Sequence, residues 1–275
     1  MFSIIICSRR GDIPSELRRN LEDTVGCTYE LVIIDNSADR YSIFQAYNEG
    51  VSRAKGEILC FMHEDVLFLS SGWGNTIEQH FSVDENIGLI GFAGAHFLPE
   101  APLYWYSSPF ISQRNLNNDN GVVEEHFHED WFDGGNLIEV VAVDGFCFFV
   151  RRSLFQRVSF DEETFKGFHQ YDMDICMQVI SAGFKVCVCR DVLAEHCWSE
   201  KMQSSKKGND LFAHNLILFV NKWKDKLPIW KGLDLPQEVF LRINSVYLKA
   251  YPANSIRRPF SLKSLFRKLK NVFIL

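Results

Sequence analysis

The stretch Glu57-Ile58-Leu59-Cys60-Phe61-Met62-His63-Glu64-Asp65-Val66 decides the fold, because an apolar run of strand length breaks directly into three ionisable side chains. Two earlier runs end in the same way: Phe2 to Cys7 leads into the polar turn Ser8 to Asp12, and Leu31 to Ile34 leads into Asp35-Asn36-Ser37. Strands that are apolar on both faces and alternate with helical patterns predict an α/β fold, with a mostly parallel sheet covered on both sides. Ligands of such sheets bind at the carboxyl ends of the strands, so these polar ends predict the active site.

The rest of the chain continues the alternation, with one interruption. The stretch from Pro99 to Leu137 loses its periodicity and gains Asn, Asp, Gly, His and aromatic residues, which predicts a long mobile loop. The other predicted elements are a helix around Trp73 to Phe81, strands at Ile87 to Ala93, Val140 to Val150 and Lys185 to Cys189, and helices at Asp172 to Ala182 and Leu211 to Trp223.

Length and composition are those of a globular enzyme with one large core. The 275 residues and net charge of -6 favour one catalytic domain over residues 1–223, with an extension over 224–275, and give no reason to expect a nucleic-acid partner. The first apolar run is too short for a signal peptide or membrane span, and the eight cysteines lie scattered in apolar segments, so we expect a reducing cytoplasm. The tail from Arg257 to Phe273 interleaves Leu and Phe with Lys and Arg, which fits either peripheral contact with the inner membrane face or packing against protein.

The triplet His63-Glu64-Asp65 is a candidate metal site. If strand geometry persists, the alternating positions His63 and Asp65 point the same way, and a divalent ion needs two or three such convergent groups. The ion would bridge the phosphates of a nucleotide donor and help them to depart. The alternative interpretation is a polar strand end with solvated charges.

The order of the motifs resembles glycosyltransferase family 2, and more closely a bacterial branch of small glycosyltransferase-like proteins. The matching strings run in order from Ser3 to His196. They are Ser3-Ile4-Ile5-Ile6-Cys7-Ser8-Arg9, Ile33-Ile34-Asp35-Asn36-Ser37, Ala46-Tyr47-Asn48-Glu49-Gly50, Ala54-Lys55-Gly56-Glu57-Ile58, His63-Glu64-Asp65-Val66, Val143-Asp144-Gly145 and Phe168-His169-Gln170-Tyr171-Asp172-Met173-Asp174. The resemblance implies a GT-A fold, which is a Rossmann-like parallel sheet flanked by helices, here with a C-terminal helical tail.

The resemblance also implies where a nucleotide sugar binds. The residues at the donor and nucleotide positions are Ser8, Arg9, Asp35, Asn36, Glu64, Asp144 and Gly145. Asp35 would accept hydrogen bonds from base or ribose, although an aspartate here can equally form a turn or cap a helix. A carboxylate and a glycine within the strand Val140 to Val150 are costly in a core unless the site is open to ligand, and the resemblance implies that Asp144-Gly145 lies beside the donor sugar and the acceptor.

Metal and base positions follow from the same resemblance. Asp65 matches the second aspartate of the family's Asp-x-Asp motif, His63 replaces the first, and His196 matches a late histidine that completes the metal site in some GT-A enzymes. The expected cofactor is Mn²⁺ or Mg²⁺. Imidazole is a poorer ligand than carboxylate for Mg²⁺ and a better one for Mn²⁺, so His63 either shifts the metal preference or leaves Asp65 as the principal ligand. Asp172 matches the base that deprotonates the acceptor hydroxyl, with Asp174 as the alternative, and Tyr171 replaces the usual preceding glutamate. Helix capping by either aspartate is the structural interpretation.

These features predict a metal-dependent inverting glycosyltransferase of surface polysaccharide or glycoconjugate assembly. Its donor would be a nucleotide-diphosphate sugar, with a UDP-sugar favoured, and its acceptor a saccharide or lipid-linked saccharide. The alternatives are a nucleotidyltransferase and a catalytically silent sugar- or nucleotide-binding module, in which His63 and Tyr171 would be signs of decay. A zinc site of Cys187, Cys189, His196 and Cys197 is a further, remote alternative, because Cys187-Val188-Cys189 lacks the usual two-residue gap.

Overall fold

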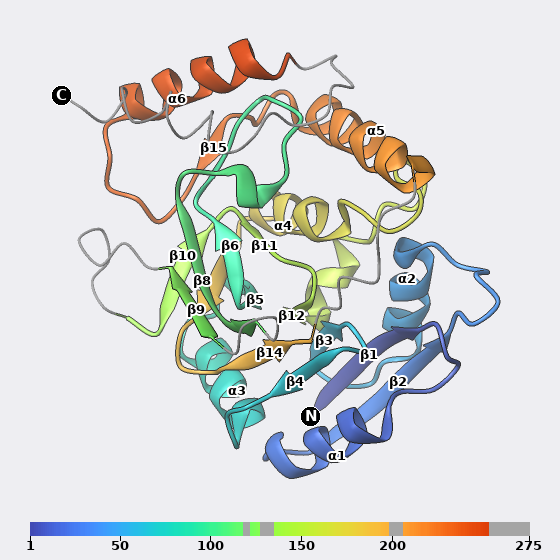
Figure 1. The fold of residues 1–275 in the computed structure, drawn as a ribbon. Helices are drawn as coiled ribbons and strands as arrows, with labels where there is room; N and C mark the ends of the chain where they lie inside the picture. The colour runs from blue at the N-terminus through green and yellow to red at the C-terminus, as the bar shows by residue number, and fades with distance from the viewer. Residues whose placement is uncertain (118–121, 127–134, 198–205, 253–275) are drawn as a thin grey trace.

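A seven-stranded sheet forms the centre of the molecule (Figure 1), described by a computed structural model over residues 1–117, 122–126, 135–197 and 206–252. In spatial order its strands are β10 (Leu137–Val140), β13 (Lys185–Cys189), β5 (Ile87–Gly91), β12 (Cys147–Arg151), β3 (Ile58–Met62), β1 (Phe2–Ser8) and β2 (Tyr29–Asp35). β1 is parallel to β2 and β3, and β13 is parallel to β5, whereas β12 is antiparallel to both β3 and β5. All strands except β10 and β12 therefore share one direction, which confirms the prediction of a mostly parallel sheet.

Helices cover both faces of this sheet, because successive side chains of a buried strand point to opposite sides. On one face, Trp73 at the start of α3 (Trp73–Val83) packs on Phe2 and Phe149. On the other face, Tyr47 of α2 (Ile43–Arg53) packs on Phe61. In Figure 1, α1 (Ser15–Thr24) lies on the α3 side, and α4 (Tyr171–Ser181) lies on the α2 side. The predicted helical flanks are thus confirmed.

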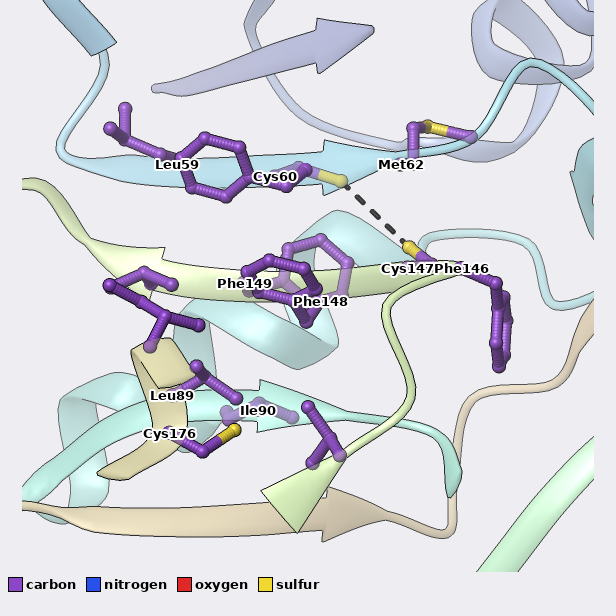
Figure 2. Close-up of a cluster of buried hydrophobic side chains, with 14 of the residues drawn as sticks. Leu59, Cys60, Met62, Leu89, Ile90, Phe146, Cys147, Phe148, Phe149 and Cys176 are labelled. Atoms are coloured by element: carbon purple, nitrogen blue, oxygen red, sulfur yellow. Dashed lines mark hydrogen bonds between the residues drawn. The ribbon is translucent and has the colours of Figure 1, made fainter. Parts of the chain in front are cut away.

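The strands β3 and β12 carry the centre of the core. Figure 2 shows Cys60 and Cys147 facing each other across the two strands, with their Sγ atoms 4.0 Å apart. Both cysteines are buried, and they are packed among phenylalanine and leucine side chains. They behave as small hydrophobes, as their apolar sequence context predicts.

A second sheet lies beside the ends of β3, β5 and β12. Its path is β11 (Ala142–Val143), β6 (Ala93–Ala95), β8 (Ile111–Asn117), β14 (Ala194–His196) and β4 (Val66–Phe68), with β9 (Val122–His126) paired to β8. The chain passes from the main sheet to this one after β3, β5, β10 and β13. Gly94 permits the close pairing of β6 with β11, since a Cβ there would lie 2.2 Å from the carbonyl oxygen of Ala142.

The prediction of a long mobile loop from Pro99 to Leu137 is wrong for much of the part of this segment that the structure describes. This segment contains the 3-10 helix η1 (Trp105–Ser107) as well as β8 and β9. The sequence Ile111-Ser112-Gln113-Arg114-Asn115 has no apolar alternation that would mark a half-buried strand. Its strand state comes from pairing with β6 and β14, which no local pattern indicates.

The C-terminal region packs against the start of that segment. β15 (Ile229–Trp230) pairs with β7 (Phe97–Leu98), which follows β6. α6 (Gln237–Ala250) follows α5 (Lys206–Trp223) and forms a second hydrophobic cluster with residues of the 97–110 stretch. The buried members of this cluster are Phe97, Ala101, Leu103, Phe110, Phe240, Ile243, Tyr247 and Tyr251. The first part of the predicted 224–275 extension thus rests on the catalytic domain.

The basic tail, on which the expectation of membrane contact depends, lies beyond residue 252 and so outside the described residues. Within the described ranges, none of the helices combines the length and the apolar character that a membrane crossing requires.

Candidate active site

The carboxyl ends of β1, β2 and β3 meet at one rim of the main sheet. Ser8 and Asp35 are direct neighbours in the β1–β2 register, and Glu64 follows the end of β3. The Ser8 hydroxyl lies 2.8 Å from Glu64 Oε2 and 2.7 Å from the carbonyl oxygen of Asp12, and it is fully buried. Ser8 therefore holds the turn after β1 against the turn after β3.

Of the other predicted donor-binding residues, Asp35 and Arg9 are the two that are exposed, whereas Asn36, Glu64 and Asp144 are half-buried. Asp35 accepts a hydrogen bond from the Ser37 backbone N–H at 2.9 Å, and the hydrogen bonds from Ser37 lower the pKa of this exposed carboxyl. The Asn36 side chain is occupied differently, because its amide bonds both the N–H and the carbonyl of Tyr41 at 2.9 Å. Asn36 thus closes the loop before α2, while Asp35 and Arg9 remain available at the rim.

His63, Asp65 and His196 converge on one point. Residues 63–65 form a turn between β3 and β4, so strand geometry does not persist, yet His63 Nδ1 lies 4.0 Å from Asp65 Oδ1. The antiparallel pairing of β14 with β4 sets His196 opposite Val66, which brings His196 Nε2 to 3.6 Å from the same oxygen. One ligand atom from each residue lies within 4.8 Å of the others.

Tyr171 fixes the orientation and tautomer of His63. The Tyr171 hydroxyl donates to the Gly145 carbonyl at 3.0 Å and lies 2.8 Å from His63 Nε2. A hydroxyl has one hydrogen, so its bond to Gly145 requires that Nε2 be the protonated nitrogen of His63. The lone pair of Nδ1 then faces Asp65, as a metal ligand requires, and the partner on the other nitrogen holds the ring in place.

The three residues fit a divalent cation. Asp65 Oδ1 is buried and has no hydrogen-bond partner among the described residues, so the site has an unused negative acceptor between two imidazoles. Burial and the neighbouring His196 lower the pKa of His63 to about 4, which keeps this imidazole neutral near pH 7. Burial raises the pKa of Asp65, but the two histidines outweigh it and the net shift is downward. Nitrogen and carboxylate ligands of this kind suit Mn²⁺.

Asp144 and Gly145 lie where the chain returns from the second sheet to the main sheet. Asp144 accepts a hydrogen bond from the Phe146 N–H at 3.0 Å, and burial raises the pKa of its carboxyl. A Cβ on Gly145 would lie 2.2 Å from the Tyr171 hydroxyl oxygen, so only glycine admits the Tyr171 ring here. The phenyl ring of Phe146 stacks on His196 with centroids 4.9 Å apart. This turn therefore supports both histidines of the candidate metal site.

Asp172 begins α4 directly after Tyr171 and is 1% exposed. Its Oδ2 accepts hydrogen bonds from the Gly145 N–H at 3.1 Å and from the Tyr104 hydroxyl. Burial, together with the negative charge of Asp144, raises the pKa of Asp172 to about 7. A carboxylate with a pKa near neutrality is suited to taking up and releasing a proton, as a general base must.

Tyr104 is the residue of this site that sequence reasoning missed. It comes from the stretch interpreted as a mobile loop, just before η1, and its phenol is buried beside Asp172. Its ring also packs on Phe212 of α5 with centroids 5.8 Å apart. The run Tyr104-Trp105-Tyr106 is a visible aromatic signal, but no spacing rule connects it to an aspartate 68 residues later.

Asp174 is placed differently from Asp172. Its fully buried carboxylate bonds Trp223 Nε1 at 2.9 Å and Lys222 Nζ at 2.8 Å, both at the end of α5. Gln178 on the next turn of α4 donates to it as well, at 2.7 Å. The contacts with Trp223 and Lys222 tie α4 to α5, so the carboxylate does not face the group formed by Asp144, Tyr171 and Asp172.

The zinc alternative fails on sheet topology. Cys187 and Cys189 lie on β13 in the main sheet, whereas His196 lies on β14 in the second sheet. In the described part of the chain, the groups of three or more convergent metal-binding side chains are His63 with Asp65 and His196, and His80 with Cys189 and Asp191. The set of three cysteines and His196 is not among them.

The fold and the rim together define a class, that of the GT-A glycosyltransferases. Three solved structures share this fold at low sequence identity. They are GalNAc-T7 with UDP, GalNAc and Mn²⁺ (TM-score 0.57, 15% identity, 98% of this chain and 54% of that chain covered), TarS 1-349 of S. aureus with UDP-GlcNAc (0.54, 14%, 98% and 79%) and the mannosyltransferase PcManGT of Pyrobaculum calidifontis with GDP-Man and Mn²⁺ (0.53, 13%, 100% and 80%). The chain thus spans about half the length of the first and about four fifths of the other two.

Residues 3–221 match the model of a glycosyltransferase-like family, and the chain belongs to that family. No curated protein sequence matches it. The match ends at residue 221, close to the predicted boundary of the catalytic domain at residue 223.

Replacing Tyr171 with Phe tests its support of His63. The ring and its packing remain, but the hydroxyl that fixes His63 Nε2 is lost, so we expect Mn²⁺ affinity to fall by about 10- to 100-fold, the usual effect of removing such a partner. Calorimetric titration with Mn²⁺ measures it. Tyr47→Phe is the matched control, because the Tyr47 hydroxyl is buried in the same aromatic cluster with no hydrogen-bond partner in the described chain. Equal Mn²⁺ affinity in both variants would refute the role of Tyr171.

Proposed function

We propose that this protein is a metal-dependent inverting glycosyltransferase that uses a nucleotide-diphosphate sugar. The observation that carries the proposal is the hydrogen-bonded connection from His63 through the Tyr171 hydroxyl to Gly145, whose own N–H bonds Asp172. This connection joins a fitted cation site to a buried carboxylate with a pKa of about 7. Cation and base must lie close together in such a reaction, because the leaving diphosphate and the attacking hydroxyl flank one anomeric carbon.

His63, Asp65 and His196 would hold the cation against the donor diphosphate. A bound Mn²⁺ or Mg²⁺ would neutralise the charge that develops on the leaving phosphate. The fold neighbours GalNAc-T7 and PcManGT are complexed with Mn²⁺, and two of the three neighbours carry UDP or a UDP-sugar, which favours a UDP-sugar as donor. Asp35 and Arg9, exposed at the same rim, are the residues that we assign to the nucleoside.

Asp172 would act as the general base. It takes the proton of the acceptor hydroxyl as that oxygen forms a bond to the anomeric carbon, while the bond from this carbon to the diphosphate oxygen breaks on the opposite face. A single displacement of this kind inverts the anomeric configuration. Because the pKa of Asp172 is about 7, the carboxylate is both partly ionised near neutrality and basic enough to assist the proton transfer.

Tyr104 occupies the position that the acceptor would take. Asp172 is 1% exposed, and the Tyr104 hydroxyl donates to its Oδ2. An acceptor hydroxyl would make the same kind of bond to the same oxygen, so it would have to displace Tyr104. Tyr104 thus keeps the buried carboxylate hydrogen-bonded before the acceptor arrives, which avoids the cost of an unpaired buried charge.

The alternative of a decayed, silent module is less favoured for a specific reason. The two departures from the family pattern, His63 and Tyr171, contact each other at 2.8 Å. Independent loss of function would leave unrelated substitutions, whereas here each side chain supplies the partner that the other needs. A nucleotidyltransferase is also less favoured, since the chain belongs to a glycosyltransferase-like family.

The acceptor that we propose is a hydroxyl of a saccharide or lipid-linked saccharide in surface polysaccharide or glycoconjugate assembly, in the cytoplasm. This proposal rests on the family resemblance of the motifs. Transfer assays with free and lipid-linked saccharides, using the donor that most raises the melting temperature, would test it.

Asp65→Ala tests the cation site. We expect the variant to fold normally and to lose Mn²⁺-dependent binding of nucleoside diphosphate, because Asp65 Oδ1 is the carboxylate oxygen that lies between the two imidazoles. Calorimetry with UDP in the presence and absence of Mn²⁺ measures the loss. Unchanged Mn²⁺-dependent affinity in the variant would sink the assignment.

Asp172→Asn tests the base. The amide keeps the size of the side chain but cannot accept a proton near neutrality, so transfer should fall by about a hundredfold or more while donor affinity stays near that of the unmodified protein. Asp174→Asn is the matched control on the same helix, and it should lower the melting temperature through its contacts with α5 while transfer by the folded protein persists. If instead Asp174→Asn abolished transfer and Asp172→Asn were silent, the two roles would be exchanged.

The pH dependence of transfer gives an independent test. The base acts when deprotonated, so kcat/KM should rise with pH through a midpoint near 7. Asp144→Asn removes the negative neighbour that raises the pKa of Asp172 and should shift the midpoint to lower pH. Tyr104→Phe removes a hydrogen bond that favours the ionised carboxylate and should shift it to higher pH. Measuring kcat/KM between about pH 5 and pH 9 tests this. A midpoint that neither variant moved would contradict the assignment of Asp172 as the base.

A further inference from the structure

A second group of metal-binding side chains lies away from the active site, at the opposite edge region of the main sheet. It consists of His80 near the end of α3, Cys189 at the end of β13 and Asp191 just after it. His80 Nε2 lies 2.8 Å from Asp191 Oδ1, and Cys189 Sγ lies 3.0 Å from the same oxygen. Helix α3 therefore presents a nitrogen, and the end of β13 with the residues just after it presents a sulfur and an oxygen, and these three atoms lie close together.

Asn136 completes the support of this group. Its amide donates to Asp191 Oδ2 at 2.9 Å, and His80 Nε2 lies 3.0 Å from that oxygen as well as 2.8 Å from Oδ1, so the carboxylate is held with Oδ1 beside both His80 and Cys189. Metal sites are commonly built in this way, with a ligating carboxylate oriented by a further hydrogen bond.

The arrangement does not suit a cysteine nucleophile. In a reactive cysteine, a base or a positive charge adjoins the sulfur and lowers its pKa. Here the carboxylate stands between the thiol and the imidazole, and burial together with Asp191 raises the pKa of Cys189 well above its ordinary value. A bare thiol at this position stays protonated and unreactive, whereas a bound cation would displace its proton.

We propose that His80, Cys189 and Asp191 bind a zinc ion. The set of one nitrogen, one sulfur and one oxygen ligand matches the mixed preference of Zn²⁺, because a thiolate ligand selects softer ions such as Zn²⁺ over Mg²⁺ and Mn²⁺. A thiolate, a carboxylate and a neutral imidazole also balance the charge of the ion, which lowers the cost of burying it.

Two of the three separations between ligand atoms need only a small adjustment, and the third is within 4.8 Å. Zinc ligands at about 2.0 to 2.3 Å from the ion stand roughly 3.3 to 3.6 Å from each other in a tetrahedron, so the present contacts would open by about half an ångström. The ion has a route of entry, because the His80 and Asp191 side chains are 15% and 28% exposed. Both also line a cavity of about 360 Å³, together with Asn136, Cys187, Glu139 and Lys185, where water could fill the fourth position.

Zinc here would join α3 to the end of β13 and thereby stabilise this edge of the sheet. The site shares no residue with the candidate active site, so its existence is independent of the proposed transferase function. His63, Asp65 and His196 could also accept zinc, and for this reason the experiment uses the Asp65→Ala protein as its background.

Cobalt(II) titration of the full-length Asp65→Ala protein, with its cysteines kept reduced, tests the proposal. Cobalt takes the place of zinc in tetrahedral sites, and a cysteine ligand gives a thiolate-to-metal charge-transfer band. We expect one equivalent of cobalt to produce this band, Zn²⁺ to abolish it, and Cys189→Ser or His80→Gln added to the background to prevent it. Zn²⁺ should also raise the melting temperature of the Asp65→Ala protein by several degrees, but not that of Asp65→Ala/Cys189→Ser.

Cys187→Ser and Cys197→Ser are the matched controls, each added to the same background. Cys187 lies two residues before Cys189 on the same strand, and Cys197 follows His196, yet neither belongs to the group of three. Both controls should keep the band. Absence of the band from the folded Asp65→Ala protein, its persistence in the Cys189→Ser variant, or its loss with Cys187→Ser or Cys197→Ser would overturn the proposal.

Discussion

The hydrogen bond between His63 Nε2 and the Tyr171 hydroxyl is the interaction on which the candidate site depends. It joins the end of β3 to the start of α4, two elements that are 108 residues apart. Because the same hydroxyl donates to the Gly145 carbonyl, the bond determines which nitrogen of His63 faces Asp65. The glycine is needed in turn, since any side chain at that position would meet the tyrosine ring. This interaction thus fixes three features together. They are the orientation of the candidate metal ligand His63, the start of the helix that carries Asp172, and the turn of the chain at Gly145.

Electrostatics then separate the carboxylates of the site by role. Asp65 stands between two imidazoles, and its pKa falls in spite of its burial. Asp172 is buried near another carboxylate and its pKa rises to about 7. Asp174 has the lysine and the indole of α5 as partners and acts as a link between helices. Side chains of one chemical type thereby acquire different pKa values and partners, which suit Asp65 and Asp172 to the proposed roles of metal ligand and proton acceptor and make Asp174 a link between helices.

The second sheet accounts for much of this environment. Its strand β14 brings His196 to the turn after β3, and the segment that carries Tyr104 leads into its strand β8. The C-terminal helix α6 packs on that same segment through Phe97, Leu103 and Phe110. Tyr104, which covers Asp172, packs on α5, and the segment that carries Tyr104 packs on α6. Helix α6 lies in the predicted 224–275 extension. The catalytic rim belongs to the main sheet, but its enclosure comes from elements added around it.

The sequence by itself determined the parallel core, the rim and most of the candidate residues, because apolar strands, helical spacing and polar strand ends are local patterns. The polar segments that end three apolar runs, at Ser8 to Asp12, Asp35 to Ser37 and His63 to Asp65, predicted the rim. Only the tertiary structure decided that β8 is a strand, that Tyr104 meets Asp172, that Asp174 faces α5 and that Cys189 joins His80 and Asp191 instead of His196. The physical reason is that strand pairing and helix packing bring together residues far apart in the chain, and no periodicity within a short window carries information about such contacts.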